Sequence, residues 1–349
     1  MKPTPSIDQH ILSAHQMNSQ NLKEIMTDAM AMENLLADME TLAQQQKTGT
    51  EDPTLQSKIE QIHTLFKNRI FGLVFEEPST RTYWSHASAA LRLGMQSITE
   101  KNPEFSSLIK GETIPDMFQV ISKYVDLLVY RSKKSGSADI AAKYSTVPII
   151  NAGDGEGEHP TQALLDFYTI LKHFPIENLA PNQKIRITFV GDLRKGRTVH
   201  SLSKLLRNFP QFEISFCAPS ELQIPDEYKS PTDKIYTDII TDEILHNSDI
   251  IYDTRVQAER YKEEGAIFMQ QIKEKEKNFV FTPENVSQMK PTSILLHPLP
   301  RVGEITAEVD TLPQAKYFEQ AENGIPVRMA LIMRLLGLRD RVLHILNAK

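Results

Sequence analysis

The chain has 349 residues, 40% of them hydrophobic and 24% charged, and its formal net charge at pH 7 is −6. A chain of this length and composition suits a globular protein of two domains. The acidic balance argues against nucleic acid as a partner, because nucleic-acid affinity rests on basic faces that neutralise phosphates. An anionic ligand would need arginines gathered in a local pocket.

Apolar runs are short throughout the chain. None approaches the roughly 20 residues that span a bilayer, and the first residues are too polar for a secretory signal, so we expect a cytoplasmic protein with no membrane partner. The single cysteine, Cys217, lies in an alternating apolar segment and is expected to be a buried thiol. No His-x-x-x-His pair or carboxylate cluster has ligand spacing, so we predict no metal ion and no cofactor.

The first half of the sequence predicts a helical N-terminal segment followed by an α/β domain. Helix-like apolar spacing runs through residues 8–45, and the polar residues 44–57 are expected to form a solvated loop or insertion. Strand-like runs then alternate with helical stretches, which is typical of βαβ units and a parallel sheet. The expected strands are residues 70–75, 127–131 and 147–151, and the expected helices are residues 85–93 and 114–124.

The second half repeats this rhythm. A helix is expected over residues 161–172, followed by a loop that contains Pro175 and Pro181. A final helix is expected from Arg328 onward. The sequence therefore predicts the α/β class, with two doubly wound parallel-sheet domains. The strands expected in the second domain are residues 185–190, 213–218, 249–253 and 293–297.

Ser79-Thr80-Arg81-Thr82 is the most informative stretch for function. It follows an expected strand and Pro78, and it stands where a helix would expose its unpaired first-turn N–H groups. Those N–H groups, three hydroxyls and a guanidinium would together bind a phosphate. The alternative is an ordinary helix cap with a solvent-facing arginine.

Further polar motifs follow along the chain, and most of them stand where an expected strand ends. Ligands of open α/β sheets bind at the carboxyl ends of the strands, so we expect these motifs to line one cleft between the two domains. The motifs are Lys110-Gly111-Glu112-Thr113, Tyr130-Arg131, His159-Pro160-Thr161-Gln162, Gly191-Asp192-Leu193 with Arg197-Thr198, Thr254-Arg255-Val256-Gln257 and His297-Pro298-Leu299-Pro300-Arg301.

One of these motifs imitates an ATP-binding loop. Residues 191–198 read Gly-x-x-x-x-Gly-Arg-Thr after an expected strand, with Arg197 in the place of the P-loop lysine. Asp192 would also oppose a nucleotide phosphate at the backbone N–H groups of the loop. We therefore do not interpret this segment as a nucleotide site.

In this order and at this spacing the motifs resemble those of the transcarbamylase family, and most closely its aspartate carbamoyltransferases. The resemblance runs from about His10 to the C-terminus. It implies transfer of the carbamoyl group from carbamoyl phosphate to the α-amine of L-aspartate, an early step of pyrimidine (UMP) biosynthesis. It also implies a carbamoyl-phosphate-binding domain, residues 1–173 with 324–349, and an aspartate-binding domain, residues 174–323, joined by crossing helices.

The resemblance assigns roles to the residues of the first domain. Ser79-Thr80-Arg81-Thr82 would hold the phosphate, and Arg81 would stabilise charge on the departing oxygen. Thr82, Arg131 and His159 would surround the carbonyl oxygen. His159 would act as a neutral hydrogen-bond donor rather than a base, because two arginines nearby disfavour the imidazolium. A cap or core histidine is the alternative for His159.

Further roles implied by the resemblance concern the carbamoyl nitrogen, the amine and the carboxylates. Gln162 and the backbone carbonyls of Pro298 and Leu299 would contact the carbamoyl NH2 group and the amine. Arginine matches carboxylates in a forked geometry. The implied clamp for aspartate consists of Arg197, Arg255 and Gln257. Arg301 and Arg328 would hold Glu77 or aspartates in place, with a surface arginine as the alternative for Arg328.

The resemblance also implies a homotrimer with shared active sites. Lys110 would enter the site of the neighbouring subunit, accompanied by Ser106 or Ser107, and regulatory or pathway-enzyme partner chains are compatible with such an assembly. The alternative for Lys110 is a solvated loop lysine. One departure from the family is Tyr83-Trp84-Ser85-His86, where many relatives have Arg-x-Ser-Phe.

Two other functions stay open at this point. A transcarbamylase for ornithine would need a negative partner for the substrate's side-chain amine and typically carries His-Cys-Leu-Pro, whereas this chain has His297-Pro298-Leu299-Pro300. A non-catalytic scaffold should have lost Arg81, Arg131 or His159, and all three are present. The sequence therefore favours an aspartate enzyme.

Overall fold

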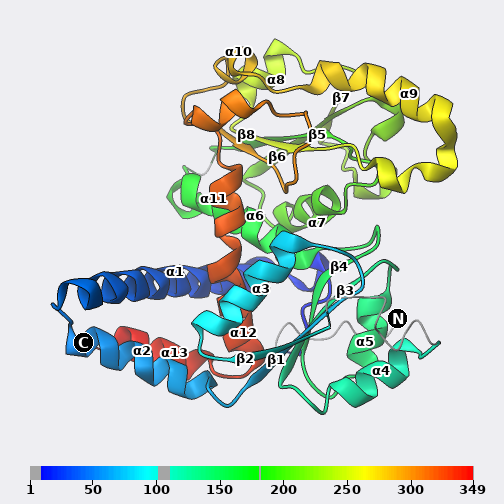
Figure 1. Cartoon of the computed structure of the whole chain (residues 1–349). Helices are drawn as coiled ribbons and strands as arrows, with labels where there is room; N and C mark the ends of the chain where they lie inside the picture. The colour runs from blue at the N-terminus through cyan, green and yellow to red at the C-terminus, as the bar shows by residue number, and fades with distance from the viewer. Residues whose placement is uncertain (1–8, 101–110, 181, 349) are drawn as a thin grey trace. The chain divides into compact units, whose positions relative to one another are not determined.

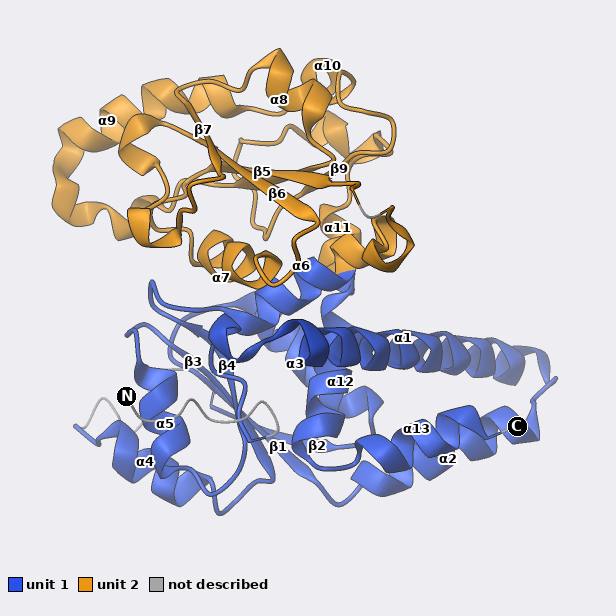
Figure 2. Cartoon of the chain, turned by 180° about the vertical axis from the view of Figure 1, so that it is seen from behind, with its two compact units in different colours: residues 1–168, 322–349 blue, residues 169–321 orange. Residues whose placement is uncertain are grey.

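The computed structural model describes residues 9–100, 111–180 and 182–348. The chain forms two compact units: unit 1 is Met1–Tyr168 with Glu322–Lys349, and unit 2 is Thr169–Ala321 (Figure 2). Each unit has one parallel sheet with helices around it, which confirms the expected fold class (Figure 1). None of the helices within the described ranges is long and apolar enough to cross a membrane.

Unit 1 is built on a sheet with the strand order β2-β1-β3-β4, in which every described pairing is parallel. Its strands are β1 (Ile70–Phe75), β2 (Gln96–Glu100), β3 (Leu127–Ser132) and β4 (Ile149–Asp154). Its helices are α1 (Ser19–Thr48), α2 (Pro53–Phe66), α3 (Thr80–Arg92), α4 (Ile114–Ile121), α5 (Ser137–Tyr144), the first part of α6 (Pro160–His173), α12 (Gly324–Leu335) and α13 (Arg339–Asn347).

The helices of unit 1 bury the sheet through apolar side chains. α4 and α5 cover it with Phe118 and Ala141, which pack with Leu128 of β3 in one buried cluster. α12 is buried along most of its length and lies against α1 and α3 (Figure 1). The last helices of the chain therefore complete the core of the first unit.

The expectation of a loop at residues 44–57 is wrong. α1 continues to Thr48 and ends at Gly49, whose left-handed φ of 69° is typical of a helix C-cap. α2 starts soon afterwards, because the Asp52 side chain accepts hydrogen bonds from the Thr54 and Leu55 amides and Pro53 fits the first turn. Polar composition in this segment reflects exposed helix surface rather than a loop.

Unit 2 has the strand order β7-β6-β5-β8-β9, again with parallel pairings throughout the described sheet. Cys217 of β6 is buried in its core, and burial raises the pKa of the thiol to about 12, so the expectation of an inert buried thiol is confirmed. The strands are β5 (Ile185–Gly191), β6 (Phe212–Ala218), β7 (Lys234–Thr237), β8 (Ile250–Thr254) and β9 (Ile294–Leu296). The helices are α7 (Arg197–Leu206), α8 (Asp242–Asn247), α9 (Gly265–Glu276), α10 (Pro283–Val286) and α11 (Tyr317–Glu322).

Candidate active site

Three adjacent strands of unit 1 carry the phosphate and carbonyl motifs at their carboxyl ends. β3 lies between β1 and β4, and all three run parallel. Ser79 follows β1, Arg131 is the last residue but one of β3, and His159 follows β4. The sheet therefore brings these motifs to one edge, which is where open α/β sheets bind ligands.

The Ser79-Thr80-Arg81-Thr82 motif forms the start of α3. Ser79 is the N-cap, in extended conformation, and its side chain makes no capping hydrogen bond to the described residues. Thr80 and Arg81 are exposed, whereas Thr82 is buried. Because the Ser79 hydroxyl does not cap the helix, this arrangement favours the anion cradle over the ordinary cap.

Arg131 is fixed in place by the two residues that follow β1 and by β4. Its guanidinium donates a hydrogen bond of 2.8 Å to the Ala152 carbonyl and forms an ion pair of 2.8 Å with Glu77. The Glu76 amide donates to the Arg131 carbonyl at 2.9 Å, and the Glu76 carboxylate accepts from Ser132 at 3.0 Å. Glu77 therefore pairs with Arg131 and holds its guanidinium in place.

His159 and Gln162 stand at the start of α6. His159 is buried, and its Nδ1 lies 3.5 Å from the Thr161 hydroxyl. The Gln162 side-chain amide donates to the Asp166 carboxylate at 2.8 Å. Because a carboxylate only accepts, the NH2 group of Gln162 must face Asp166, and its amide oxygen is directed elsewhere as an acceptor. An acceptor is what a carbamoyl NH2 group requires.

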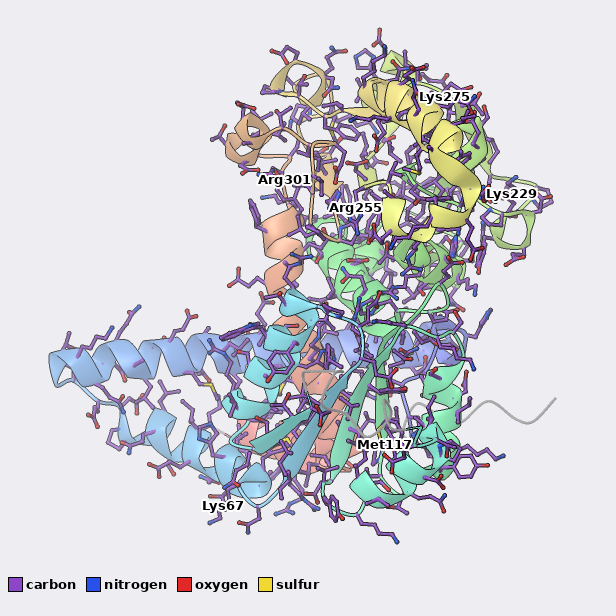
Figure 3. All side chains as sticks on the ribbon, turned by 45° about the vertical axis from the view of Figure 1, so that its right-hand side comes forward. Lys67, Met117, Lys229, Arg255, Lys275 and Arg301 are labelled. Atoms are coloured by element: carbon purple, nitrogen blue, oxygen red, sulfur yellow. The ribbon has the colours of Figure 1, made fainter. Side chains whose placement is uncertain are left out.

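In unit 2, the motifs that are expected to bind carboxylates also stand at the carboxyl ends of adjacent strands. β8 lies between β5 and β9. Arg197 follows β5, Arg255 follows β8 and Pro298 follows β9. Arg197 is the first residue of α7 and is buried, whereas Arg255 is half-buried. Arg255 and Arg301 both belong to this unit (Figure 3). The second sheet thus also gathers cationic side chains at one edge.

Asp192 joins two of these loops, a role that the sequence did not indicate. Its carboxylate accepts hydrogen bonds from the Lys195 amide (3.1 Å), the Gln257 amide (3.1 Å) and the Tyr261 hydroxyl (2.7 Å). Burial raises the pKa of Asp192, although these donors act in the opposite direction. The one feature of the sequence that could have indicated this role is that Asp192 closely follows an expected strand. Its bonds to backbone amides also agree with rejecting a P-loop.

Gly191 permits the close approach of these two loops. Its φ is 100°, and a Cβ atom at this position would lie only 2.0 Å from the Thr254 carbonyl oxygen. Only glycine combines this backbone angle with this space. Gly191 therefore sets the distance between two loops: the one from β5 to Arg197 and the one that begins at Arg255.

Arg255 already binds a carboxylate in the structure. Its guanidinium donates to both carboxylate oxygens of Glu259, one of them at 3.0 Å, and to the Val256 carbonyl at 3.1 Å. The hydrogen bonds to Glu259 raise the pKa of Arg255. The forked contact is the geometry expected for a substrate carboxylate. Glu259 was missed by sequence reasoning, although its spacing of four residues from Arg255 was visible.

Gln257 and the loop after β9 are also positioned by local hydrogen bonds. The Gln257 amide group donates to the Lys195 carbonyl at 3.0 Å. Buried His297 accepts from the Leu299 amide at Nδ1 and contacts Glu304 at Nε2, both at 2.8 Å, so its proton belongs on Nε2. Leu299 has a left-handed φ of 52°, and the peptide bond to Pro300 is cis. These contacts fix the turn that carries the Pro298 and Leu299 carbonyls.

The remaining predicted residues divide into three cases. Arg301 binds Asp310 and the Tyr317 hydroxyl, which agrees with its expected role of holding an aspartate. Arg328 is buried, so the surface alternative for it is wrong. Lys110, Ser106 and Ser107 lie outside the described residues. Across the described ranges no group of three His, Cys, Asp or Glu side chains could hold a metal ion.

Both units thus place arginines, hydroxyls and amides at the carboxyl ends of three adjacent parallel strands. This arrangement defines a two-domain α/β protein that binds small anionic ligands. Two sequence models match the chain: "Aspartate/ornithine carbamoyltransferase, carbamoyl-P binding domain" over residues 9–172, and "Aspartate/ornithine carbamoyltransferase, Asp/Orn binding domain" over residues 183–335. The chain belongs to the aspartate/ornithine carbamoyltransferase family, which confirms the resemblance seen in the sequence.

Individual relatives agree with this assignment. The chain is 39% identical over 331 residues to the aspartate carbamoyltransferase catalytic subunit of Methanocaldococcus jannaschii, covering 94% of this chain and 97% of that one. Crystal structures of Trypanosoma cruzi aspartate transcarbamoylase are also similar. The complex with N-(phosphonacetyl)-L-aspartic acid has a TM-score of 0.78 and 32% identity, with coverage of 94% and 96%. The complex with carbamoyl phosphate and aspartate has a TM-score of 0.77 and 31% identity, with coverage of 94% and 95%.

Proposed function

We propose that this chain transfers the carbamoyl group of carbamoyl phosphate to the α-amine of L-aspartate, as an early step of pyrimidine synthesis. The products are N-carbamoyl-L-aspartate and phosphate. The observation that carries the proposal is that each unit places its anion-binding side chains at the carboxyl ends of three adjacent strands. The similar Trypanosoma cruzi protein was crystallised with carbamoyl phosphate and aspartate together.

Unit 1 binds carbamoyl phosphate in this proposal. The first turn of α3, with Ser79, Thr80 and Arg81, holds the phosphate, and Thr82, Arg131 and His159 donate hydrogen bonds to the carbonyl oxygen. Gln162 accepts from the carbamoyl NH2 group through the amide oxygen that Asp166 leaves available. Donors fixed in advance stabilise charge as it develops on the carbonyl oxygen, since they need no rearrangement during the reaction.

Unit 2 binds aspartate. Arg197 and Arg255 bind its two carboxylates, Gln257 assists them, and the Pro298 and Leu299 carbonyls accept from the amine and the carbamoyl group. The amine nitrogen forms a bond to the carbonyl carbon and loses a proton, the bond from that carbon to the phosphate oxygen breaks, and the departing phosphate takes up the proton. Arg81 stabilises the negative charge that the leaving oxygen gains. The chemistry requires no metal ion or cofactor in this proposal.

A panel of amines tests the choice of acceptor. Purified protein with carbamoyl phosphate is assayed against aspartate, ornithine, putrescine and acetylornithine, without added metal or nucleotide. We expect turnover with aspartate only, because the predicted clamp is built from arginines, which repel a cationic side chain. Turnover with ornithine and none with aspartate would overturn the assignment. No turnover with any amine would instead support the non-catalytic scaffold.

Replacement of Arg255 should affect aspartate alone. We expect Arg255→Ala to raise the KM for aspartate by one to two orders of magnitude, because one forked carboxylate contact is lost, and to leave the KM for carbamoyl phosphate nearly unchanged. Steady-state kinetics with each substrate varied in turn gives both values. The matched control is Arg186→Ala. Arg186 is an exposed arginine that pairs with Glu213, and it lies at the start of β5, away from the strand ends that carry the candidate site. Equal rises for both substrates would contradict the assignment.

We also propose that the chain forms a homotrimer in the cytoplasm, with Lys110 completing the site of a neighbouring subunit. Unit 1 offers a surface that suits such contacts. Trp84 and Leu91 of α3 and Ile98 of β2 are exposed apolar side chains, and β2 is the edge strand of its sheet. Exposed apolar side chains on neighbouring elements are typical of subunit interfaces.

A further inference from the structure

A buried polar network lies directly behind the phosphate-binding turn of unit 1. Arg328 of α12 and His86 of α3 are both buried, and the Arg328 Nε atom lies 3.1 Å from His86 Nδ1. The same Nδ1 atom lies 2.8 Å from the carbonyl oxygen of Thr82. His86 therefore touches the backbone of a residue in the phosphate motif without belonging to that motif.

The other end of this network reaches the residue proposed to bind the carbamoyl NH2 group. Asp166 of α6 acts on Arg328 as the opposite charge and accepts the hydrogen bond from Gln162. Burial lowers the pKa of Arg328 to about 10, with Asp166 opposing the shift, so the guanidinium stays charged at neutral pH. A charged group buried in this way needs acceptors around it.

The backbone makes specific room for the Arg328 guanidinium. A Cβ atom at Gly324, in the turn before Arg328, would lie 2.0 Å from the Arg328 Nη1 atom. Glycine at this position lets the guanidinium lie over the start of α12. The location of Arg328 is therefore built into the helix that carries it.

The two contacts of His86 Nδ1 cannot both be hydrogen bonds of a neutral imidazole. Arg328 Nε is a donor and needs a lone pair on Nδ1, whereas the Thr82 carbonyl is an acceptor and needs a proton there. The Thr82 carbonyl also accepts from the Ser85 hydroxyl at 3.2 Å, so it does not depend on His86. The bond from a charged donor is roughly twice as strong as a neutral one. The lone pair on Nδ1 is the better solution.

The charged groups that act on His86 keep it neutral. Burial lowers its pKa well below the ordinary value, Arg328 from α12 and Arg131 from β3 lower it further, and only the Thr82 carbonyl opposes them. With the proton on Nε2, that atom is buried without a hydrogen-bond partner among the described residues. A neutral imidazole at this place accepts from Arg328 at the cost of one unpaired N–H group.

We infer that His86 is a positioning residue: as a neutral acceptor it anchors Arg328, and the chain of interactions from Gln162 through Asp166 and Arg328 to His86, in which charge attraction alone joins Asp166 to Arg328, fixes the first turn of α3 relative to the start of α6. This inference rests on the proposed function, because the proposed function assigns carbamoyl phosphate to both the start of α3 and the start of α6. Through this chain, the groups that bind the phosphate and the carbamoyl NH2 group keep a constant separation. Small displacements of positioned groups are costly in catalysis.

Two variants of similar size distinguish a role of His86 as a hydrogen-bond acceptor from a role in packing alone. The Asn Oδ1 atom of His86→Asn can occupy the place of Nδ1, whereas His86→Leu offers no acceptor. We expect His86→Leu to lower kcat/KM for carbamoyl phosphate by about tenfold to a hundredfold, and His86→Asn to stay within about threefold of wild type. A packing role predicts the reverse order, because burying an amide costs more than burying a leucine. Equal activities of the two variants would overturn the inference.

A spectroscopic measurement tests the network without turnover. Nitrogen NMR of labelled protein, with the His86 signal among the 10 histidines assigned by its loss in His86→Asn, reports which ring nitrogen carries the proton. We expect a neutral ring at pH 7 with the proton on Nε2. A proton on Nδ1, or an imidazolium, would overturn the inference even if the enzyme is active. If wild type transfers no carbamoyl group, the proposed function fails, while this measurement still decides the Arg328–His86 contact.

The pH profile gives a second independent result. Burial holds the pKa of His86 in the folded protein well below its ordinary value, so protonation disrupts the network only on the acid side. We expect the wild-type kcat/KM to fall at acidic pH as His86 takes up a proton. The asparagine of His86→Asn does not titrate, so this variant should lack that part of the fall. Identical acid limbs in both proteins would contradict the positioning role. Inorganic phosphate binding, measured by calorimetry, should weaken in parallel in His86→Leu.

Discussion

Arg81→Ala should lower kcat by on the order of a thousandfold while the protein stays folded. Arg81 lies in the first turn of α3 and is exposed, so its removal should leave the core of unit 1 intact. Its proposed task is to stabilise charge on the departing phosphate oxygen, which is largest in the transition state. Removal should therefore lower kcat more than it weakens the binding of carbamoyl phosphate. Steady-state kinetics and thermal unfolding of the variant check both statements.

Two matched variants make this result specific. Arg92→Ala removes an exposed arginine from the last turn of the same helix, where its Nε atom donates to the Ser88 hydroxyl at 3.2 Å, and should leave kcat unchanged. Arg81→Lys keeps the charge but loses the forked geometry, so its kcat should lie between those of wild type and Arg81→Ala. A higher KM with unchanged kcat in Arg81→Ala would mean that Arg81 binds only the ground state.

Strands buried on both faces were the most predictable part of the fold. β1 spans the expected residues 70–75, and β3 and β5 differ from their expected bounds by one residue. Their continuous apolar runs are the signal of a buried parallel strand. β2 was missed because every residue of Gln96–Glu100 is exposed, and an exposed edge strand carries no apolar pattern. Its pairing with β1 depends on the neighbouring strand rather than on its own sequence.

The site was predictable where the chemistry is carried by single side chains next to strand ends. Arg131, His159 and Arg255 stand at such positions, and their residue types suit the proposed ligands. Their partners were less predictable, because pairing depends on distance in the fold. Asp192 and Tyr261 are 69 residues apart in sequence yet share a hydrogen bond, and no local pattern announces this contact. Positioning groups therefore required the structure.

The arrangement of subunits can be tested by mixing two inactive variants. In a closed ring of three subunits, each site would combine Arg81 of one subunit with Lys110 of the next. Arg81→Ala and Lys110→Ala homotrimers should both be nearly inactive. In any mixed ring exactly one interface pairs an intact Arg81 with an intact Lys110, so every mixed trimer regains one native site.

The recovered activity follows from counting the rings. Random reassembly of equal amounts leaves about three-quarters of the trimers mixed, and each has one of its three sites restored, which predicts about a quarter of wild-type activity. The variants are dissociated, mixed, reassembled and assayed, with each variant reassembled alone as the control. If both residues served a site within one subunit, no mixture could recover activity. Reassembled mixtures that remain as inactive as their parents, while sizing as trimers, would rule out the shared site.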